Sequence, residues 1–390
     1  MPVINLHVSL TPFRNESRVL KESESLAAAG LVDKVCIVAL HEDGLRETEQ
    51  IDAARDVVRV RLSTRSLPKN LFSQLIKYAE FGWQVLKIAK ARGSTIHNMH
   101  SVGLIPIGVL LKLFRGGKLI FDAHELETET NGLVGMRKRA AKLVERATIG
   151  FADLVIVVSP GIERWYRERY RGLPIVTVLN TPRHVSSSRS SVLREKLGIP
   201  DHFRIAIYQG GLMSNRGIKE LIDAAPIVAK AGYAIVFMGY GPMQAEVEAA
   251  AARNVNIYFY PAVPPSQILR HTASADVGIC SISGVSLSYR LSLPNKLFEY
   301  IAAGIPVIAS ALPEMERVIM MRRVGVCVST WTPDVIAAAL SEIDHMRGAE
   351  LDSRISRTAE EYSWESQEAA MIAAYRNLLG RASAGAQALL

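Results

Sequence analysis

The stretch LPNKLFEYIAAGIPVIAS, residues 293–310, gives the clearest fold signal in this sequence. Its first part is predicted to form a helix between Pro294 and Gly304, because proline favours a helix start and glycine the position just after a helix end. Its last part, Val307 to Ala309, is a short apolar run typical of a buried strand. A helix followed directly by a buried strand is the repeating unit of an α/β fold.

The same alternation of short apolar runs and helical segments extends outward over most of the chain. Strands are expected in the first half at residues 3–9, 34–40, 57–62, 118–121, 154–158 and 175–179. In the second half they are expected at residues 204–208, 234–238, 255–259, 277–282, 307–309 and 325–328. A polar Pro, Ser and Arg stretch at residues 181–191 separates the two series and resembles an inter-domain linker.

A chain of 390 residues exceeds what one core usually supports. We therefore expect an α/β protein with two Rossmann-like, doubly wound domains, one over residues 1–182 and the other over 183–370. In such sheets ligands bind beyond the carboxyl ends of the strands, so the two domains should face a central cleft.

The composition, 49% hydrophobic and 22% charged, is that of a folded globular protein. Cys36, Cys280 and Cys327 lie too far apart to indicate a disulfide or metal framework. The longest apolar stretch, residues 102–114, is too short to span a membrane, and no signal peptide is evident, so a cytoplasmic protein is expected. The net charge of +8 favours an anionic partner, and no motif supports nucleic acid.

Two glycine-rich strand ends are candidate phosphate sites. Gly210 and Gly211 follow a strand and precede a helix expected near Asn215, whose first turn would hold Arg216. Backbone N–H groups at such a turn attract phosphate, and a cation there is favoured when an anion lies nearby. The alternative is a plain turn with a solvated arginine. Gly239 and Gly241, after the next strand, suggest a tight turn or a second close approach to the ligand.

Lys296 and Glu299 lie three residues apart on one face of the predicted 294–304 helix. The lysine is suited to a phosphate, and the carboxylate is suited to the vicinal hydroxyls of a ribose. The alternative is an ordinary surface pair of a lysine and a glutamate.

The order of these motifs resembles the nucleotide-sugar domain of the retaining glycosyltransferases of family 4, which have the GT-B fold. The first half carries further segments similar to that family in the same order: IHNMHSVG at 96–103, FDAHE at 121–125, ADLVIVVS at 152–159 and VLNTP at 178–182. The resemblance covers nearly the whole chain. It implies that the terminal segment, residues 371–390, returns as a helix to the N-terminal, acceptor-binding domain.

The resemblance also implies roles for individual residues. Glu299 matches a ribose-binding glutamate, and Arg216 and Lys296 match contacts to the diphosphate. His124 matches a histidine that touches the donor sugar, which makes His124, Arg216 and Lys296 the candidate catalytic residues. The remaining candidates are the donor-binding glycines Gly210, Gly211, Gly239 and Gly241, and the donor or acceptor contacts Arg14, Asn15, Asn295 and Ser310. Arg18 is a further candidate anion contact.

Two positions depart from the family pattern: Leu291 replaces the first glutamate of the family's pair, and Gly211 stands where many members have arginine. They leave open the identity of the donor and suggest one alternative, a catalytically degenerate partner subunit. A second alternative is a nucleotide-sugar epimerase of similar fold, which would need no acceptor.

The expected activity is transfer of a sugar, with retention of configuration, from a nucleotide diphosphate sugar to a saccharide or lipid-linked acceptor, as in bacterial polysaccharide or glycoconjugate synthesis. The sequence shows no clustered metal ligands, so we expect no metal and no cofactor beyond this co-substrate. Two basic segments, residues 70–92 and 136–146, read as amphipathic helices that would bind an anionic membrane surface or, alternatively, pack on the core.

Overall fold

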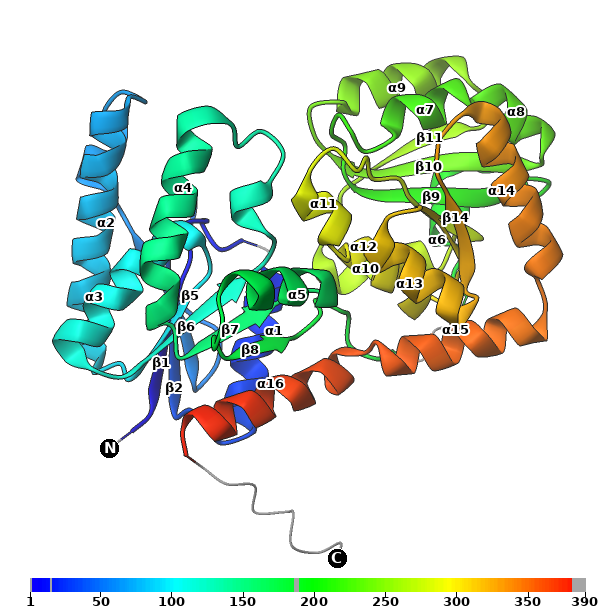
Figure 1. The fold of residues 1–390 in the computed structure, drawn as a ribbon. Coiled ribbons are helices and arrows are strands. Elements are labelled where there is room, and N and C mark those ends of the chain that lie inside the picture. The colour runs from blue at the N-terminus through cyan, green and yellow to red at the C-terminus, as the bar shows by residue number, and fades with distance from the viewer. Residues whose placement is uncertain (1, 15, 186–188, 381–390) are drawn as a thin grey trace, which may run out of the picture. The chain divides into compact units, whose positions relative to one another are not determined.

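The computed structural model describes residues 2–14, 16–185 and 189–380. The chain separates into two compact units, passing from the first to the second between Val178 and Leu179 and returning between Gln367 and Glu368. Each unit contains one sheet with helices packed on it (Figure 1). The expectation of two doubly wound α/β domains is confirmed.

The sheet of the first unit has, among the described residues, eight strands in the order β3-β4-β2-β1-β5-β6-β7-β8. All neighbours are parallel except β3 and β4. The order reverses between β1 and β5, and the carboxyl ends of strands at such a point are where open α/β sheets bind ligands. The strands are β1 (Ile4–Val8), β2 (Lys34–Leu40), β3 (Thr48–Gln50), β4 (Arg55–Val60), β5 (Ile96–Met99), β6 (Lys118–Ala123), β7 (Leu154–Val157) and β8 (Ile175–Thr177).

Local sequence signals set the ends of several helices in the first unit. The Asn70 side chain accepts a hydrogen bond from the Ser73 N–H at 2.8 Å, which caps α2, and Gly93 ends that helix with a φ of +68°. Ser159 caps α5 in the same way. The helices are α1 (Ser17–Ala28), α2 (Leu71–Arg92), α3 (Ile105–Arg115), α4 (Gly135–Thr148), α5 (Pro160–Arg169) and the second half of α16 (Trp364–Leu378), with short 3₁₀ helices at Ser63–Ser66, Val102–Leu104, Glu127–Glu129 and Ile149–Phe151.

The six strands described in the second unit are all parallel and run in the order β11-β10-β9-β12-β13-β14. Numbered within the unit, this is the 3-2-1-4-5-6 order of a Rossmann sheet, with its reversal between β9 and β12. The strands are β9 (Arg204–Gly211), β10 (Tyr233–Tyr240), β11 (Ile257–Pro261), β12 (Val277–Cys280), β13 (Val307–Ser310) and β14 (Gly325–Val328).

Both faces of this second sheet are covered by helices, which explains its nearly continuous apolar strands. Alternate residues of β9 enter two separate cores: Ile205 and Ile207 pack with α12, α13 and α15, and Ala206 and Tyr208 pack with α7, α8, α9 and α14. The helices are α6 (Val192–Leu197), α7 (Ile218–Asp223), α8 (Ala225–Lys230), α9 (Gln244–Arg253), α10 (Pro265–Thr272), α11 (Leu287–Leu291), α12 (Asn295–Ala302), α13 (Pro313–Arg322), α14 (Pro333–Met346) and α15 (Ala349–Glu361).

The glycine-rich strand ends differ from the sequence expectation. Gly210 and Gly239 are not in turns: they pair with each other in the ladder between β9 and β10. A Cβ on Gly239 would lie 1.9 Å from the carbonyl oxygen of Gly210, so no larger residue fits there. The helix expected near Asn215 begins instead at Ile218, because Asn215 and Gly217 have φ values of +64° and +71°, which an α-helix does not accept.

Candidate active site

The ammonium group of Lys296 is the most unusual charge in the second unit. Lys296 lies in the first turn of α12, is 9% exposed, and has no hydrogen-bond partner among the described residues. Its Nζ lies 3.7 Å from the centre of the Tyr208 ring and beside Gly210, at the carboxyl end of β9. Burial lowers the pKa of Lys296 to about 8. A buried cation without an acceptor is costly, and an anionic ligand would offset that cost.

Arg216 brings a second cation to the same end of the sheet. Its guanidinium lies 4.7 Å from the centre of the Tyr289 ring, and it further lowers the pKa of Lys296. The Arg216 carbonyl accepts a hydrogen bond of 2.6 Å from Ser281, directly after β12. A Cβ on Gly217 would lie 2.5 Å from the Ser281 Cβ, so glycine is required beside this contact. Arg216 therefore precedes α7, and its predicted place in the first helical turn is wrong.

Glu299, one turn after Lys296, accepts a hydrogen bond from Gln209, which was not among the candidates predicted from the sequence. The side-chain amide of Gln209 donates to Glu299 Oε2 at 2.5 Å, and its carbonyl accepts from the Thr272 hydroxyl at 2.6 Å. In the sequence, Gln209 directly follows the apolar run at residues 204–208 and precedes the glycine pair, and this position is the signal that could have identified it. Because Lys296 is buried without a hydrogen-bond partner in the described structure, the alternative of a solvated lysine-glutamate pair is wrong.

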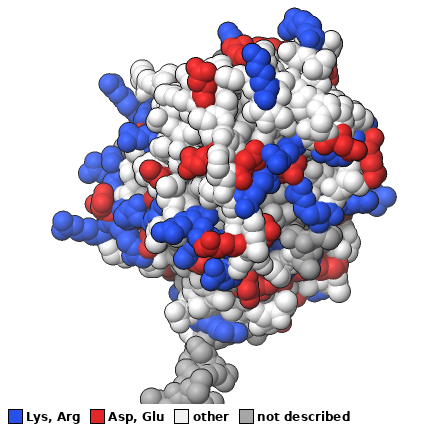
Figure 2. Space-filling model, turned by 90° about the vertical axis from the view of Figure 1, so that its right-hand side faces the viewer, with Lys and Arg blue, Asp and Glu red and all other residues white. Residues whose placement is uncertain are grey.

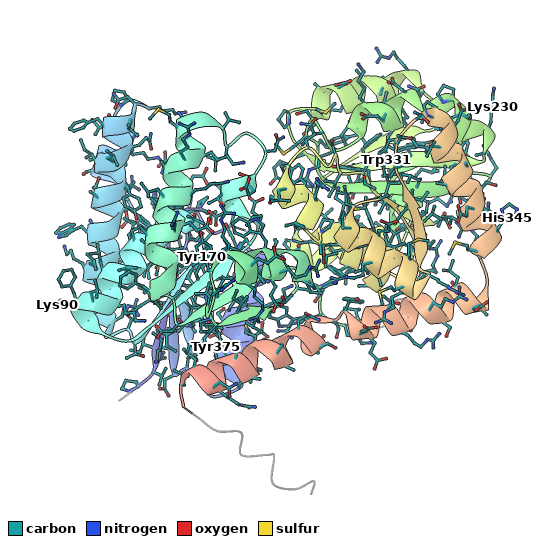
Figure 3. The ribbon with its side chains drawn as sticks, viewed as in Figure 1. Lys90, Tyr170, Lys230, Trp331, His345 and Tyr375 are labelled. Atoms are coloured by element: carbon teal, nitrogen blue, oxygen red, sulfur yellow. The ribbon has the colours of Figure 1, made fainter. Side chains whose placement is uncertain are left out.

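The other candidates in this unit have differing surroundings. Asn295 is exposed at the start of α12. Ser310 is buried, and its hydroxyl oxygen accepts from the Ile282 N–H and from the indole of Trp331, both at 2.9 Å (Trp331 is labelled in Figure 3). Gly241 lies close to a backbone carbonyl that a Cβ would strike at 2.4 Å, whereas Gly211 has room for a side chain.

Leu291, the residue that replaces a family glutamate, is half-buried at the end of α11.

In the first unit, a cluster of buried or half-buried ionisable side chains surrounds Asp122, at the carboxyl end of β6. Arg18 on α1 reaches this fully buried carboxylate with hydrogen bonds of 2.8 Å to Oδ1 and 3.1 Å to Oδ2, and it forms an ion pair of 2.9 Å with Glu22. The His124 Nε2 lies 3.2 Å from Asp122 Oδ2, and the His124 side chain is 36% exposed. Burial alone raises the pKa of Asp122, but Arg18 and the histidines hold it well below its usual value. The carboxylate therefore stays ionised.

These contacts revise the expectation for Arg18 and add His100 to the cluster. Arg18 is a buried partner of Asp122 rather than an anion contact. His100 lies 3.1 Å from Asp122 Oδ2, whereas His97 contacts the Gly116 carbonyl at the amino-terminal side of the sheet. The sequence did not reveal this cluster because its members come from three strands and one helix.

Of the two candidates in the N-terminal loop, Arg14 and Asn15, the structure describes Arg14. Arg14 is exposed and pairs with Glu42 at 2.8 Å. Asn15 lies outside the described residues.

Glu127, which was not among the candidates predicted from the sequence, accepts hydrogen bonds from Ser101 and from the Val102 N–H, and burial raises its pKa to about 7. It ties the loop after β6 to the start of the helix after β5.

Within the described residues, two groups of ligand atoms are compact enough to hold a metal: His7 with Glu22 and His100, and His100 with Asp122 and His124. Arg18 approaches both groups through its contacts with Glu22 and Asp122. A divalent cation in either position would face a buried guanidinium, which is electrostatically unfavourable. These ligand atoms come from separate segments of the sequence and are brought together by the fold.

Comparison with protein families identifies both halves of the chain. The model described as "Glycosyl transferase 4-like domain" matches residues 16–181, and the model "Glycosyl transferases group 1" matches residues 204–344. The two segments together cover well over half of the chain. No curated protein matches the chain in a sequence search.

Solved glycosyltransferase structures resemble the whole chain at low sequence identity. A sucrose-phosphate synthase from Thermosynechococcus elongatus has a TM-score of 0.79 and 18% identity, covering 97% of this chain and 100% of its own. WaaG, a glycosyltransferase involved in lipopolysaccharide biosynthesis, has a TM-score of 0.68 and 15% identity, covering 97% and 100%. Anabaena HepE in complex with UDP-glucose has a TM-score of 0.70 and 15% identity, covering 95% and 98%. The chain belongs to the family 4 glycosyltransferases, which have the GT-B fold.

Proposed function

We propose that the chain transfers a sugar from a nucleotide diphosphate sugar that binds at the carboxyl end of the second sheet. The observation that carries this proposal is the buried Lys296 ammonium, which has no hydrogen-bond partner in the described residues and lies beside Gly210. A diphosphate supplies the missing acceptor and charge. The structure of the similar HepE with UDP-glucose supports a donor of this class.

In this proposal each residue has one task. Lys296 and Arg216 stabilise the negative charge that develops on the leaving diphosphate, as fixed cations do in phosphate chemistry. Glu299, oriented by Gln209, accepts hydrogen bonds from the ribose hydroxyls. His124 contacts the donor sugar. Transfer with retention of configuration is what the resemblance to family 4 implies, and in this proposal Lys296 and Arg216 serve the diphosphate in place of a metal.

The acceptor is proposed to be a saccharide or a lipid-linked saccharide at an anionic membrane surface. The helices α2, α3 and α4 pack side by side and leave large apolar side chains exposed. These are Leu71, Phe72, Leu75 and Trp83 on α2, Leu110, Leu113 and Phe114 on α3, and Met136 and Leu143 on α4. Exposed Arg137, Arg139 and Arg146 lie on α4 among them. Apolar and basic side chains together favour an anionic bilayer.

The face drawn in Figure 2 contrasts with this three-helix surface. On the face in Figure 2, basic and acidic side chains are interspersed. None of the described helices combines the length and the apolarity needed to cross a bilayer. Contact with a membrane would therefore be peripheral, through α2 to α4.

The first experiment measures release of nucleoside diphosphate from a panel of nucleotide sugars, beginning with UDP-glucose, with and without membrane extract. We expect one donor to be consumed only with extract, and the activity to be lost in Glu299→Ala. The matched control is Glu248→Ala, which removes an exposed helical glutamate of the same unit. Consumption without any acceptor would favour an epimerase or hydrolase. No binding of any donor would favour a degenerate partner subunit.

A second experiment measures sedimentation of the chain with vesicles of anionic or neutral lipid. We expect binding to the anionic vesicles and its loss in Met136→Glu, whose methionine is 82% exposed on α4. Met321→Glu, at a methionine 69% exposed in the second unit, is the matched control and should bind normally. Equal binding by both variants would contradict the membrane proposal.

A further inference from the structure

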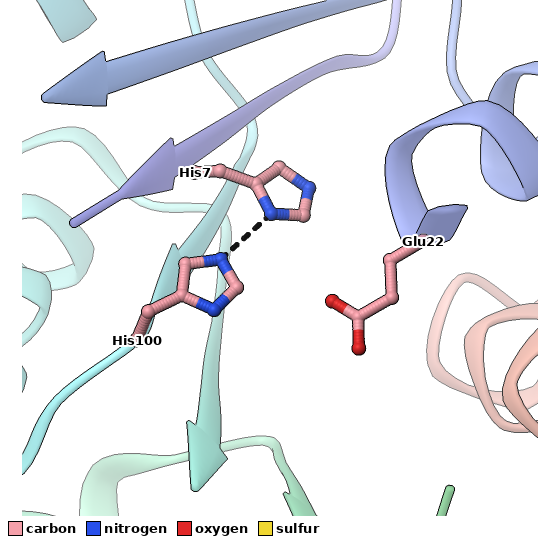
Figure 4. Close-up of side chains that lie close together, drawn as sticks. All are labelled: His7, Glu22 and His100. Carbon is pink, nitrogen blue, oxygen red and sulfur yellow. Dashed lines mark hydrogen bonds between the residues drawn. The ribbon is translucent and has the colours of Figure 1, made fainter. Parts of the chain in front are cut away.

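A line of buried hydrogen bonds in the first unit leads from β1 to His124. The side-chain amides of Asn5 and Asn98 lie 3.0 and 3.3 Å from His7 Nε2. His7 Nδ1 lies 2.8 Å from His100 Nε2, the contact drawn as a dashed line in Figure 4. His100 Nδ1 then lies 3.1 Å from Asp122 Oδ2. The line crosses three neighbouring strands of the sheet.

The carboxylate at the end of this line decides which nitrogens carry hydrogen. An ionised carboxylate only accepts hydrogen bonds, so His100 Nδ1 donates to Asp122. The His100 Nε2 then accepts from His7 Nδ1–H, and His7 Nε2 accepts from the amides of Asn5 and Asn98. Every member donates towards Asp122. Neutral imidazoles are required for this arrangement, and burial lowers the pKa of both His7 and His100.

The same reasoning assigns the tautomer of neutral His124. Its Nε2 lies 3.2 Å from Asp122 Oδ2 and 3.0 Å from His100 Nδ1. An Nε2 without hydrogen could accept a neutral hydrogen bond from His100 Nδ1–H, but its electron pair would also face the carboxylate, which is repulsive. An Nε2–H instead donates a charge-assisted hydrogen bond to Asp122, which is the stronger of the two interactions. A neutral His124 therefore carries its hydrogen on Nε2, and its Nδ1 is left as an acceptor on a side chain that is 36% exposed.

We propose that Asp122 is a positioning residue that holds His124 in the Nε2–H tautomer, so that His124 Nδ1 accepts a hydrogen bond from one hydroxyl group of the sugar substrate. Arg18, His100 and His7 support this role because each donates towards Asp122 directly or through a neighbour. The inference rests on the proposed glycosyl transfer for the identity of the ligand. It specifies that the partner of His124 must donate a hydrogen, which a hydroxyl does and a carbonyl or fluorine does not.

The tautomer is tested directly by nuclear magnetic resonance on the full chain labelled with ¹⁵N-histidine. Long-range ¹H–¹⁵N correlations distinguish the two neutral tautomers, and the spectrum of His124→Gln identifies the signals of His124. We expect the Nε2–H form in the wild-type chain and the Nδ1–H form in Asp122→Asn, because the amide of an asparagine can donate to Nε2. An Nδ1–H form in the wild type would overturn the proposal. So would an equimolar bound metal ion coordinated by His124, found by elemental analysis.

A second buried aspartate of the same sheet provides the control for the loss of a buried charge. Asp56 on β4 is 8% exposed and pairs with Arg92. Asp56→Asn should leave the tautomer of His124 unchanged. A tautomer that changes in both variants would show a general structural effect and overturn the assignment to Asp122. If Asp122→Asn does not fold, the wild-type spectrum and the substrate analogues below still decide the outcome.

The hydroxyl partner is tested with donors in which single hydroxyl groups are replaced by fluorine. At one position we expect fluorine to lower kcat/KM about 10- to 100-fold in the wild type, the range for one hydrogen bond to a neutral or charged group. In His124→Ala the same replacement should have little effect. A full fluorine effect in His124→Ala would overturn the proposal. The spectra need no donor, so failure of the proposed glycosyl transfer would appear only in this assay.

Discussion

The two units hold their buried cations in opposite ways. Arg18 in the first unit is surrounded by acceptors: Asp122, Glu22 and the Val178 carbonyl. Lys296 in the second unit has the face of Tyr208 and no hydrogen-bond partner among the described residues. Removing one partner from a compensated buried cation destabilises the fold even when no ligand is present, whereas an uncompensated buried cation costs free energy until an anion binds. The first cluster is therefore built for stability and orientation, and the second for binding.

The largest effect is expected from breaking the compensated cluster. Arg18→Met leaves two buried carboxyl groups without their cation and should lower the free energy of unfolding by about 3–5 kcal/mol. Chemical denaturation measures this change. The surface variant Arg354→Met, which removes a helical ion pair to the exposed Glu350, should change stability by less than about 1 kcal/mol. Equal losses of unfolding free energy in the two variants would show that the buried cluster contributes no more to stability than a surface ion pair.

The opposite behaviour is expected at Lys296. Lys296→Met removes a buried cation that has no partner in the described structure, so the melting temperature should not fall. Activity should fall about 100- to 1000-fold, the range for losing one group that stabilises transition-state charge. Thermal melting and nucleoside diphosphate release, measured on the same preparation, test both parts. A variant that melts early would mean that Lys296 serves the fold.

A smaller effect is expected from pH. Since the pKa of Lys296 is about 8, the fraction of protonated lysine, and with it the affinity for a nucleoside diphosphate, should fall about tenfold between pH 7 and 9. Titration calorimetry across this range measures the dissociation constant. Lys296→Arg stays charged and should bind with little dependence on pH. An equal pH dependence in that variant would assign the titration to another group.

The smallest effect is expected at Arg14, whose pair with Glu42 is exposed on both sides. Arg14→Ala should change the free energy of unfolding by less than about 1 kcal/mol. If Arg14 contacts the donor or the acceptor, the KM for one of them rises, and Glu42→Ala has no such effect. An unchanged KM in both variants would remove Arg14 from the candidate contacts.

Much of the fold is predictable from the sequence because its signals are local. The run Gly325 to Val328 is predicted and observed as a strand with the same bounds, and Pro294 and Gly304 flank the observed α12. β3 was missed because it is a three-residue, exposed edge strand without apolar residues. The glycines Gly210 and Gly239 were misplaced into turns, because their role depends on a contact across two strands.

The site was predictable only in part, for the same reason. Lys296 and Glu299 are close in sequence, so a helical spacing was enough to select them together. Gln209, which donates to Glu299, lies 90 residues away from it along the chain, and Thr272, which donates to Gln209, lies 63 residues from Gln209. Nothing local in the sequence connects these residues. His7, His100 and His124 come together only through the order of strands in the sheet.

The last helix, α16, has a consequence for synthesis of the chain. It begins in the second unit and ends in the first, where Met371 and Tyr375 are fully buried and the Tyr375 hydroxyl accepts a hydrogen bond of 2.6 Å from Asn98 (Tyr375 is labelled in Figure 3). Domains usually fold in the order in which the ribosome releases them. Here the first unit emerges first and is completed last, because its final buried side chains are translated after the whole of the second unit. A nascent chain lacking α16 would expose Asn98 and the apolar surface around it until this helix has been synthesised.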